Sequence, residues 1–123
     1  MSEQSQAEQA ALTNPQRKFL RRLGHQLNPL VIIGRDGIGE PLVEAVNQAL
    51  ATHELIKVKI IATSSVNKHD AAETVPRLTG SRLVQLIGKT LLLYKPNPKR
   101  SKDQRIVLPS AAGGKATDRG LGD

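Results

Sequence analysis

The apolar residues of this chain recur at helical spacing in three segments and at strand spacing in four. Positions three and four residues apart predict helices over about 14–26, 39–52 and 70–80. The first strand segment, 30–33, is wholly apolar, which is typical of a strand buried on both faces or of a central parallel strand. In the second, 55–60, apolar residues alternate with polar ones, so this strand should keep one face open.

Residues with special backbone preferences mark where several of these elements begin and turn. Thr13 and Gln16 have the spacing of a capping box ahead of the first helix. Pro76 predicts a kink in the third helix, or its end. The pair Gly88-Lys89 separates two β-rich runs, so it predicts a type II′ hairpin with glycine at the first central position. The inward-facing positions of this hairpin are expected to be Val84, Leu86, Leu91 and Leu93.

The predicted order of elements is α-β-α-β-α-β-β, and this order defines the fold class. Consecutive β-α-β crossovers are right-handed, so the second and third helices should cover the same face of the sheet. We therefore expect an α/β protein, a two-layer sandwich with a four-stranded mixed sheet, built from residues 13–108. Residues 1–12 and 109–123 are expected to be a flexible and a disordered tail, 95–105 a mobile basic arm, and 106–108 a short edge strand.

Positive charge is concentrated in the part of the chain that should fold. Residues 13–108 hold 16 basic and 7 acidic residues, a net charge of +9, within a whole chain of +7. A folded unit this basic usually has a polyanionic partner, most often nucleic acid. On the first helix the basic residues gather opposite the apolar face with no acidic residue among them, and two further cations lie on the open side of strand 55–60. The helix residues are Arg17, Lys18, Arg21 and Arg22, and the strand residues are Lys57 and Lys59.

A glycine-bounded turn, GRDG, joins the apolar strand to the second helix. A turn that enters a helix leaves backbone N–H groups unpaired, with the positive end of the helix dipole behind them. Gly34 and Gly37 permit positive φ and let a ligand approach the backbone, although the same glycines fit an ordinary turn that needs them for geometry alone. Arg35 adds a cation, whereas Asp36 weighs against a phosphate unless it points away. The spacing lacks the GxGxxG pattern and a Walker lysine, so a GxxG clamp on a nucleic-acid backbone fits better than a mononucleotide site.

Three stretches of the chain resemble one known family. They are the GxxG turn at 34–37, HELIKVKI at 53–60 and QLIGKTLLLY at 85–94, within a likeness that covers about residues 12–108. The sequence resembles the bacterial YhbY-like proteins, which are stand-alone CRM domains (chloroplast RNA splicing and ribosome maturation). The resemblance implies a fold similar to the C-terminal domain of translation initiation factor three. It also implies RNA binding and association with precursors of the large (50S) ribosomal subunit.

The resemblance assigns RNA contact to the turn and to the basic face of the first helix. The residues concerned are Gly34, Arg35, Asp36, Gly37, Arg17, Lys18, Arg21 and Arg22. This chain has Gly39 where many relatives have Ser or Thr, so the second helix should lack a side-chain N-cap. The chain has one Phe and one Tyr, so we expect binding through rRNA phosphates and RNA shape rather than through base stacking on aromatic rings.

Other classes of function find less support in the sequence. His25, His53 and His69 have no partner at metal-ligand or nucleophile spacing, so we expect no catalysis, no metal and no cofactor. The chain has no cysteine, and no apolar run approaches the ~20 residues of a membrane span, so we expect a cytoplasmic protein without a membrane partner. We also expect the protein to be a monomer. Two alternatives stay open: a general architectural protein that binds DNA, and a small enzyme that handles a nucleotide or phosphate at the glycine turn.

Overall fold

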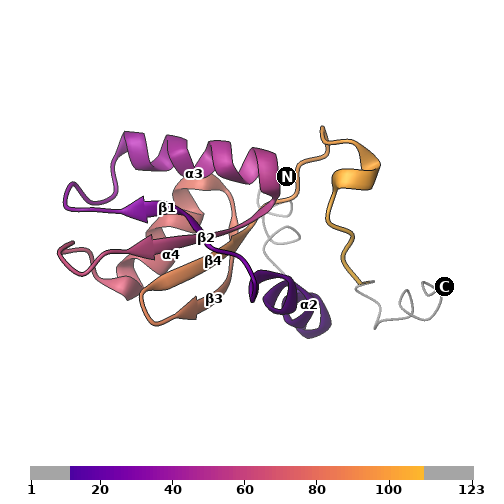
Figure 1. The fold of residues 1–123 in the computed structure, drawn as a ribbon, viewed down its shortest axis with the longest axis horizontal. Coiled ribbons are helices and arrows are strands. Elements are labelled where there is room, and N and C mark those ends of the chain that lie inside the picture. The colour runs from indigo at the N-terminus through magenta and orange to yellow at the C-terminus, as the bar shows by residue number, and fades with distance from the viewer. Residues whose placement is uncertain (1–11, 110–123) are drawn as a thin grey trace, which may run out of the picture.

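The computed structural model describes residues 12–109, and its elements follow the order expected from the sequence (Figure 1). This part of the chain contains three α-helices, four strands and one short 3₁₀ helix. They are α2 (Asn14–Gly24), β1 (Pro29–Ile33), α3 (Glu40–His53), β2 (Leu55–Ile60), α4 (Lys68–Thr79), β3 (Arg82–Ile87), β4 (Thr90–Tyr94) and η1 (Lys102–Gln104). The two expected tails lie almost wholly outside the described residues.

The four strands form one mixed sheet in the order β1-β2-β4-β3. β1 and β2 are parallel, and β4 runs antiparallel to both of its neighbours, β2 and β3. β4 therefore lies between two strands that precede it in the chain, and β1 and β3 are the edges. α3 and α4 pack together on one face of the sheet, as the handedness of the crossovers predicts (Figure 1). The expected α/β sandwich with a four-stranded mixed sheet is confirmed.

Two apolar cores lie on opposite faces of the sheet, because alternate residues of a strand point to opposite sides. The larger core packs α3 and α4 on Val31, Ile33 and alternate residues of β2 and β4. The smaller core packs Leu20 and Phe19 of α2 on Leu92 and its neighbours. α2 covers one end of this second face (Figure 1), so the other end stays open.

Local chemistry sets the start of α2 and the hairpin turn as expected. The Gln16 N–H donates to the Thr13 hydroxyl, and the Thr13 N–H donates to the Gln16 side chain, which completes the capping box. Gly88 has a φ of 59°, the positive value that a type II′ turn requires at this place. Pro76, in contrast, does not end α4, which continues to Thr79. Packing of α4 on the larger core outweighs the one helical hydrogen bond that proline removes.

A bulge in β3 changes which of its side chains face the larger core. Leu83 pairs with Leu93 but Gln85 pairs with Leu92, so Val84 is an extra residue between the two pairs. Leu83 packs on the larger core, whereas Val84 lies in the smaller core under α2. Val84 is therefore buried as expected, but on the opposite face of the sheet from the other three expected hairpin positions, which pack on the larger core.

A buried carboxylate, that of Glu54, binds several groups of the basic arm and of the residue after it. Glu54 has 0% of its surface exposed, and it accepts hydrogen bonds from the backbone N–H groups of Asn97 at 2.6 Å and Ile106 at 2.7 Å. Arg100 Nη1 lies 3.7 Å and Arg105 Nε 3.5 Å from its oxygens. The structure thus places the arm against the domain, because these four groups surround one buried negative charge.

The segment after the arm packs on the domain without forming the expected edge strand. Ile106 and Leu108 lie against the smaller core instead. Tyr94 belongs to the same core, and its burial raises the pKa of the phenol, with the negative charge of Glu54 raising that pKa further.

Candidate nucleic-acid interface

The GRDG turn leaves the end of β1 as a tight, exposed bend. The Gly37 N–H donates to the Gly34 carbonyl at 3.1 Å, which closes a turn with Arg35 and Asp36 at its exposed tip. Gly37 has a φ of 74°, so its backbone conformation favours glycine. Gly34 has no positive φ, so the conformational freedom expected of both glycines is used at Gly37 alone.

Gly34 has open space around it. A Cβ added there would meet one atom within 4 Å, Ile61 Cδ1 at 3.9 Å, which is an ordinary contact. Neither the backbone conformation nor crowding inside the fold therefore calls for glycine at this position. A missing side chain here leaves room for an outside partner to approach the backbone closely.

The helix that follows the turn begins without a side-chain cap. Its N-cap is Gly39, which makes no side-chain hydrogen bond to the first-turn amides, as expected. Those amides carry the positive end of the α3 dipole. Glu40 lies in the first turn of α3, so its carboxylate stands beside these backbone donors.

The four basic residues of α2 do not form one uniform surface. Arg17 turns back toward the sheet, where its Nη1 donates to two carbonyl oxygens of the β3 bulge at 2.8 and 2.9 Å. Lys18 and Arg22 are exposed on successive helical turns, and the partly buried Arg21 lines a shallow groove with Lys18. Arg17 is thus engaged in holding the fold, and three cations remain directed at the surface.

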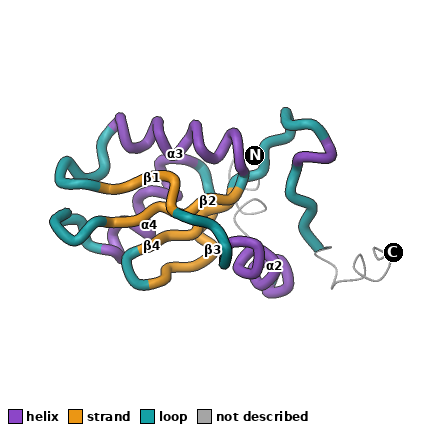
Figure 2. The backbone as a smooth tube through the Cα atoms, viewed as in Figure 1, coloured by secondary structure: helices purple, strands orange, loops and turns teal. Residues whose placement is uncertain are grey.

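The turn and α2 lie at opposite ends of the sheet (Figures 1 and 2). The turn follows the last residue of β1, whereas α2 packs where β2 begins and β4 ends, at Leu55 and Tyr94. A strand of five residues such as β1 spans about 16 Å, so roughly this length separates the two parts. The open sheet face lies between them and carries the partly buried Lys57 and the exposed Lys59. The structure therefore does not bring the two predicted parts together directly.

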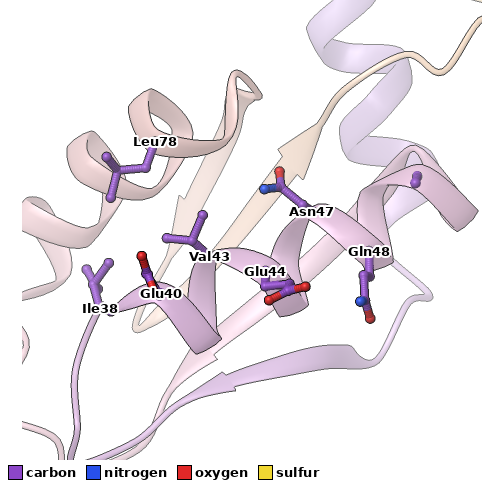
Figure 3. A pocket seen from close by; sticks show the side chains of 9 residues that line it. Ile38, Glu40, Val43, Glu44, Asn47, Gln48 and Leu78 are labelled. Carbon is purple, nitrogen blue, oxygen red and sulfur yellow. The ribbon is translucent and has the colours of Figure 1, made fainter.

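A groove between α3 and α4 lies on the other face of the sheet, and its lining is acidic and apolar. It has a volume of about 860 Å³ and is lined by Glu40 and Glu44 among other residues, with no lysine or arginine. Figure 3 shows Val43 of α3 and Leu78 of α4 beside this groove. A nucleotide phosphate would find no cation there, so the lining of this groove does not suit a nucleotide.

Metal chemistry and membrane insertion find no support among residues 12–109. This part of the chain contains no group of three His, Cys, Asp or Glu residues placed to hold a metal ion. His25, His53 and His69 are each exposed. No helix between residues 12 and 109 is long and apolar enough to cross a membrane.

β1 is an edge strand, and two of its large apolar side chains are exposed. Leu30 and Ile32 are 53% and 49% exposed, whereas Val31 and Ile33 are buried. The expectation of a central strand is wrong, because β1 pairs with β2 alone. The expectation of burial on both faces is also wrong, because α2 does not reach the part of the second sheet face that β1 forms. All four residues are apolar, so no polar alternation in the sequence marks the exposed side. Leu30 and Ile32 line a groove of about 490 Å³ that continues into the GRDG turn.

Several known proteins are similar to most of this chain, and one of them has a solved structure. Residues 12–95 match the family model described as CRS1 / YhbY (CRM) domain. The probable RNA-binding protein YqeI of Bacillus subtilis is 36% identical over 98 residues, which cover 80% of this chain and 99% of the relative. A Haemophilus influenzae protein named RNA-binding protein is 38% identical over 98 residues, with 80% and 95% covered. The solution structure of SAV1595 from Staphylococcus aureus matches with a TM-score of 0.65 at 36% identity, covering 80% of this chain and all of that one.

Proposed function

The chain belongs to the CRS1 / YhbY (CRM) domain family, and on this premise we propose that it binds ribosomal RNA and acts without catalysis. The contacts are the GRDG turn at one end of the sheet and the exposed cations of α2 at the other. The observation that carries the proposal is the open space at Gly34 beside the exposed Arg35. Two relatives named as RNA-binding proteins support the class of ligand.

The turn offers two features that suit a sugar-phosphate backbone. Without a Cβ at Gly34, a phosphate can come within hydrogen-bonding distance of the main chain. Arg35, exposed at the tip, supplies a guanidinium that matches phosphate oxygens in two parallel hydrogen bonds. Contacts of this kind position an RNA without reading its sequence.

The distribution of charge supports one RNA-facing side. α2 contains four basic residues and no acidic one, and the open sheet face adds Lys57 and Lys59. α3, in the opposite layer, contains two glutamates and no lysine or arginine. A polyanion is therefore drawn toward α2 and the open sheet.

The family resemblance extends the proposal to ribosome assembly. We place the protein among the factors that associate with precursors of the large ribosomal subunit. It would act there as a cytoplasmic monomer that stabilises immature RNA. This step is tested by replacing Arg21 and Arg22 with Glu and sedimenting cell extract through a gradient. The variant should no longer co-migrate with large-subunit precursors. Unchanged co-migration would refute a role for the basic face of α2.

A matched pair of single variants separates contact from general charge. Arg22→Glu and Arg77→Glu make the same charge change on exposed helical residues, but Arg77 lies on α4 in the opposite layer. Arg22→Glu should weaken binding of a labelled rRNA fragment, and it should reduce the slope of log K against log salt by about 1. Arg77→Glu should change both much less. Equal losses in the two variants would show that net charge, rather than this surface, governs binding.

The salt dependence and the choice of nucleic acid test the remaining alternative, a general DNA-binding protein. Neutralising roughly five to seven phosphates predicts a slope of about −4 to −6 in log K against log salt. The cations of α2 could meet phosphates of either nucleic acid, so competition between structured RNA and duplex DNA is decisive. The proposal expects RNA to compete at lower concentration, and equal competition would favour the architectural protein.

A further inference from the structure

A groove runs along the outer edge of β1 and ends at the GRDG turn. It holds about 490 Å³ and is lined by Leu30 and Ile32 of β1, Gly34 and Asp36 of the turn, and Pro41 and Ala45 of α3, with four neighbours. Asp36 is the one ionisable residue in this lining. Because its walls are apolar and carry no cation, the groove itself is a poor seat for phosphate, unlike the turn at its end.

The free edge of β1 adds backbone hydrogen-bonding groups to these apolar walls. The Ile61 N–H donates to the Ile33 carbonyl at 3.1 Å, so the polar backbone groups of Ile33 face toward β2. Successive residues of a strand direct these groups to opposite sides, which turns the N–H and C=O of Ile32 outward. Among residues 12–109, no strand pairs with β1 on that side. The groove therefore presents a donor and an acceptor next to the exposed side chains of Leu30 and Ile32.

These features match the chemistry of an unpaired RNA base. A base has flat apolar faces that pack on aliphatic side chains, and its edge carries donors and acceptors that need partners once it leaves a duplex. The turn would hold the adjoining phosphate at the end of the same groove. Asp36 supplies a carboxylate, which accepts hydrogen bonds but cannot donate them.

We propose that this groove holds one unpaired RNA base beside the phosphate bound at the turn, and that Asp36 makes guanine the preferred base. The proposal rests on the RNA-binding function proposed above. Guanine presents two adjacent N–H donors, which pair with both oxygens of a carboxylate. Uracil presents one N–H between two carbonyl oxygens, which repel a carboxylate, and so it should bind least well.

The test fills the groove without disturbing the backbone. Ala45→Leu places a larger side chain in the groove from an exposed helical position, and leucine is a good helix former. Ala51→Leu is the matched control, because Ala51 is an exposed alanine on the same helix that does not line this groove. The probes are labelled nine-nucleotide oligouridylates with A, C, G or U at the centre, and binding is measured by fluorescence anisotropy.

The wild-type protein should bind the oligonucleotide with central guanine at least about fivefold more tightly than oligouridylate, the lower end of the discrimination given by a bidentate base contact. Ala45→Leu should abolish this preference, and Ala51→Leu should keep it. Equal binding of all four probes by the wild-type protein, or an intact preference in Ala45→Leu, would overturn the base site and leave the groove to another occupant, such as a peptide strand paired with β1. Binding of none of the probes, nor of a labelled rRNA fragment, would instead refute the proposed function itself.

Asp36→Asn separates base reading from simple electrostatics. Removal of a negative charge near a phosphate should strengthen binding of all four probes by the same factor if Asp36 acts through charge alone. If Asp36 accepts hydrogen bonds from guanine, the preference for guanine should fall while binding of oligouridylate stays the same or strengthens. A uniform increase would overturn the role of Asp36.

Discussion

Replacing Glu54 tests what holds the basic arm in place. Its carboxylate is fully buried and accepts short hydrogen bonds from the Asn97 and Ile106 N–H groups, at 2.6 and 2.7 Å. The alternative account is that the arm stays in place through the packing of Ile106 on the smaller core, with Glu54 adding little. The two accounts predict different losses of stability.

The expected loss follows from the contacts. Each hydrogen bond to a charged group contributes about 1.5–3 kcal/mol, whereas the two arginines are more than 3.4 Å away and partly exposed, and so contribute little. Glu54→Ala leaves two donors without their partner, so it should lower the free energy of unfolding by about 3–5 kcal/mol. Glu54→Gln keeps the shape but directs an NH₂ group at one of the donors, and about 2–4 kcal/mol should be lost. These are large fractions of a typical total of about 5–15 kcal/mol.

A third variant separates the carboxylate from the backbone conformation. Glu54 has a φ of 64°, in the left-handed region, where glycine is favoured. Glu54→Gly should therefore be about 1 kcal/mol less harmful than Glu54→Ala. Urea unfolding followed by circular dichroism measures each loss, and hydrogen exchange at the Asn97 and Ile106 amides reports on the arm itself. A loss below about 1 kcal/mol in Glu54→Ala, with both amides still protected, would refute the role assigned to the carboxylate.

Three further predictions concern the second face of the sheet and the pH dependence of stability. Arg17→Ala removes two hydrogen bonds to the β3 bulge and should lower the free energy of unfolding by about 2–3 kcal/mol. The control Lys18→Ala should change it by less than about 0.5 kcal/mol. Urea unfolding compares the two variants, and equal effects would contradict the structural role of Arg17. Gly24→Ala brings a Cβ to 2.7 Å from Leu92 Cδ1 in the smaller core, so a loss of about 1–3 kcal/mol is expected in the same assay despite the better helix propensity of alanine, and a gain in stability would show that Leu92 can move aside. Burial raises the pKa of Tyr94 above its ordinary value of 10.0, so the phenol of the unfolded chain loses its proton first, and the free energy of unfolding should fall as pH rises above about 10. Tyr94→Phe should make that fall shallower in urea unfolding between about pH 9 and 11.5. An unchanged dependence of the free energy of unfolding on pH would contradict the raised pKa of Tyr94.

Elements that depend on neighbouring residues could be predicted from the sequence. The capping box of Thr13 and Gln16 is a contact across three residues, and the turn at Gly88 depends on one positive φ. In both cases the residues that determine the local structure lie within a few positions of one another. The GRDG turn was found for the same reason, although whether it contacts RNA stays a prediction.

Features that depend on distant partners could not be predicted in this way. The exposure of Leu30 and Ile32 depends on which strand lies at the edge, and in an apolar run no residue marks that side. Arg17 looks like its exposed neighbours in sequence, but the carbonyl groups that engage it lie 66 and 67 residues away. Glu54 likewise collects donors from 43 and 52 residues further along the chain. Contacts between residues so far apart in the sequence depend on the whole fold.

The position of β4 has a consequence for the order in which the protein can fold during synthesis. β4 is one of the two inner strands and the last strand of residues 12–109 to be made, since it joins β2 to β3 and both precede it in the chain. A nascent chain that ends before residue 90 can pair β1 with β2, but its β3 has no neighbour and its helices cover half a sheet. Cooperative folding must therefore wait until Thr90–Tyr94 has emerged from the ribosome that makes it.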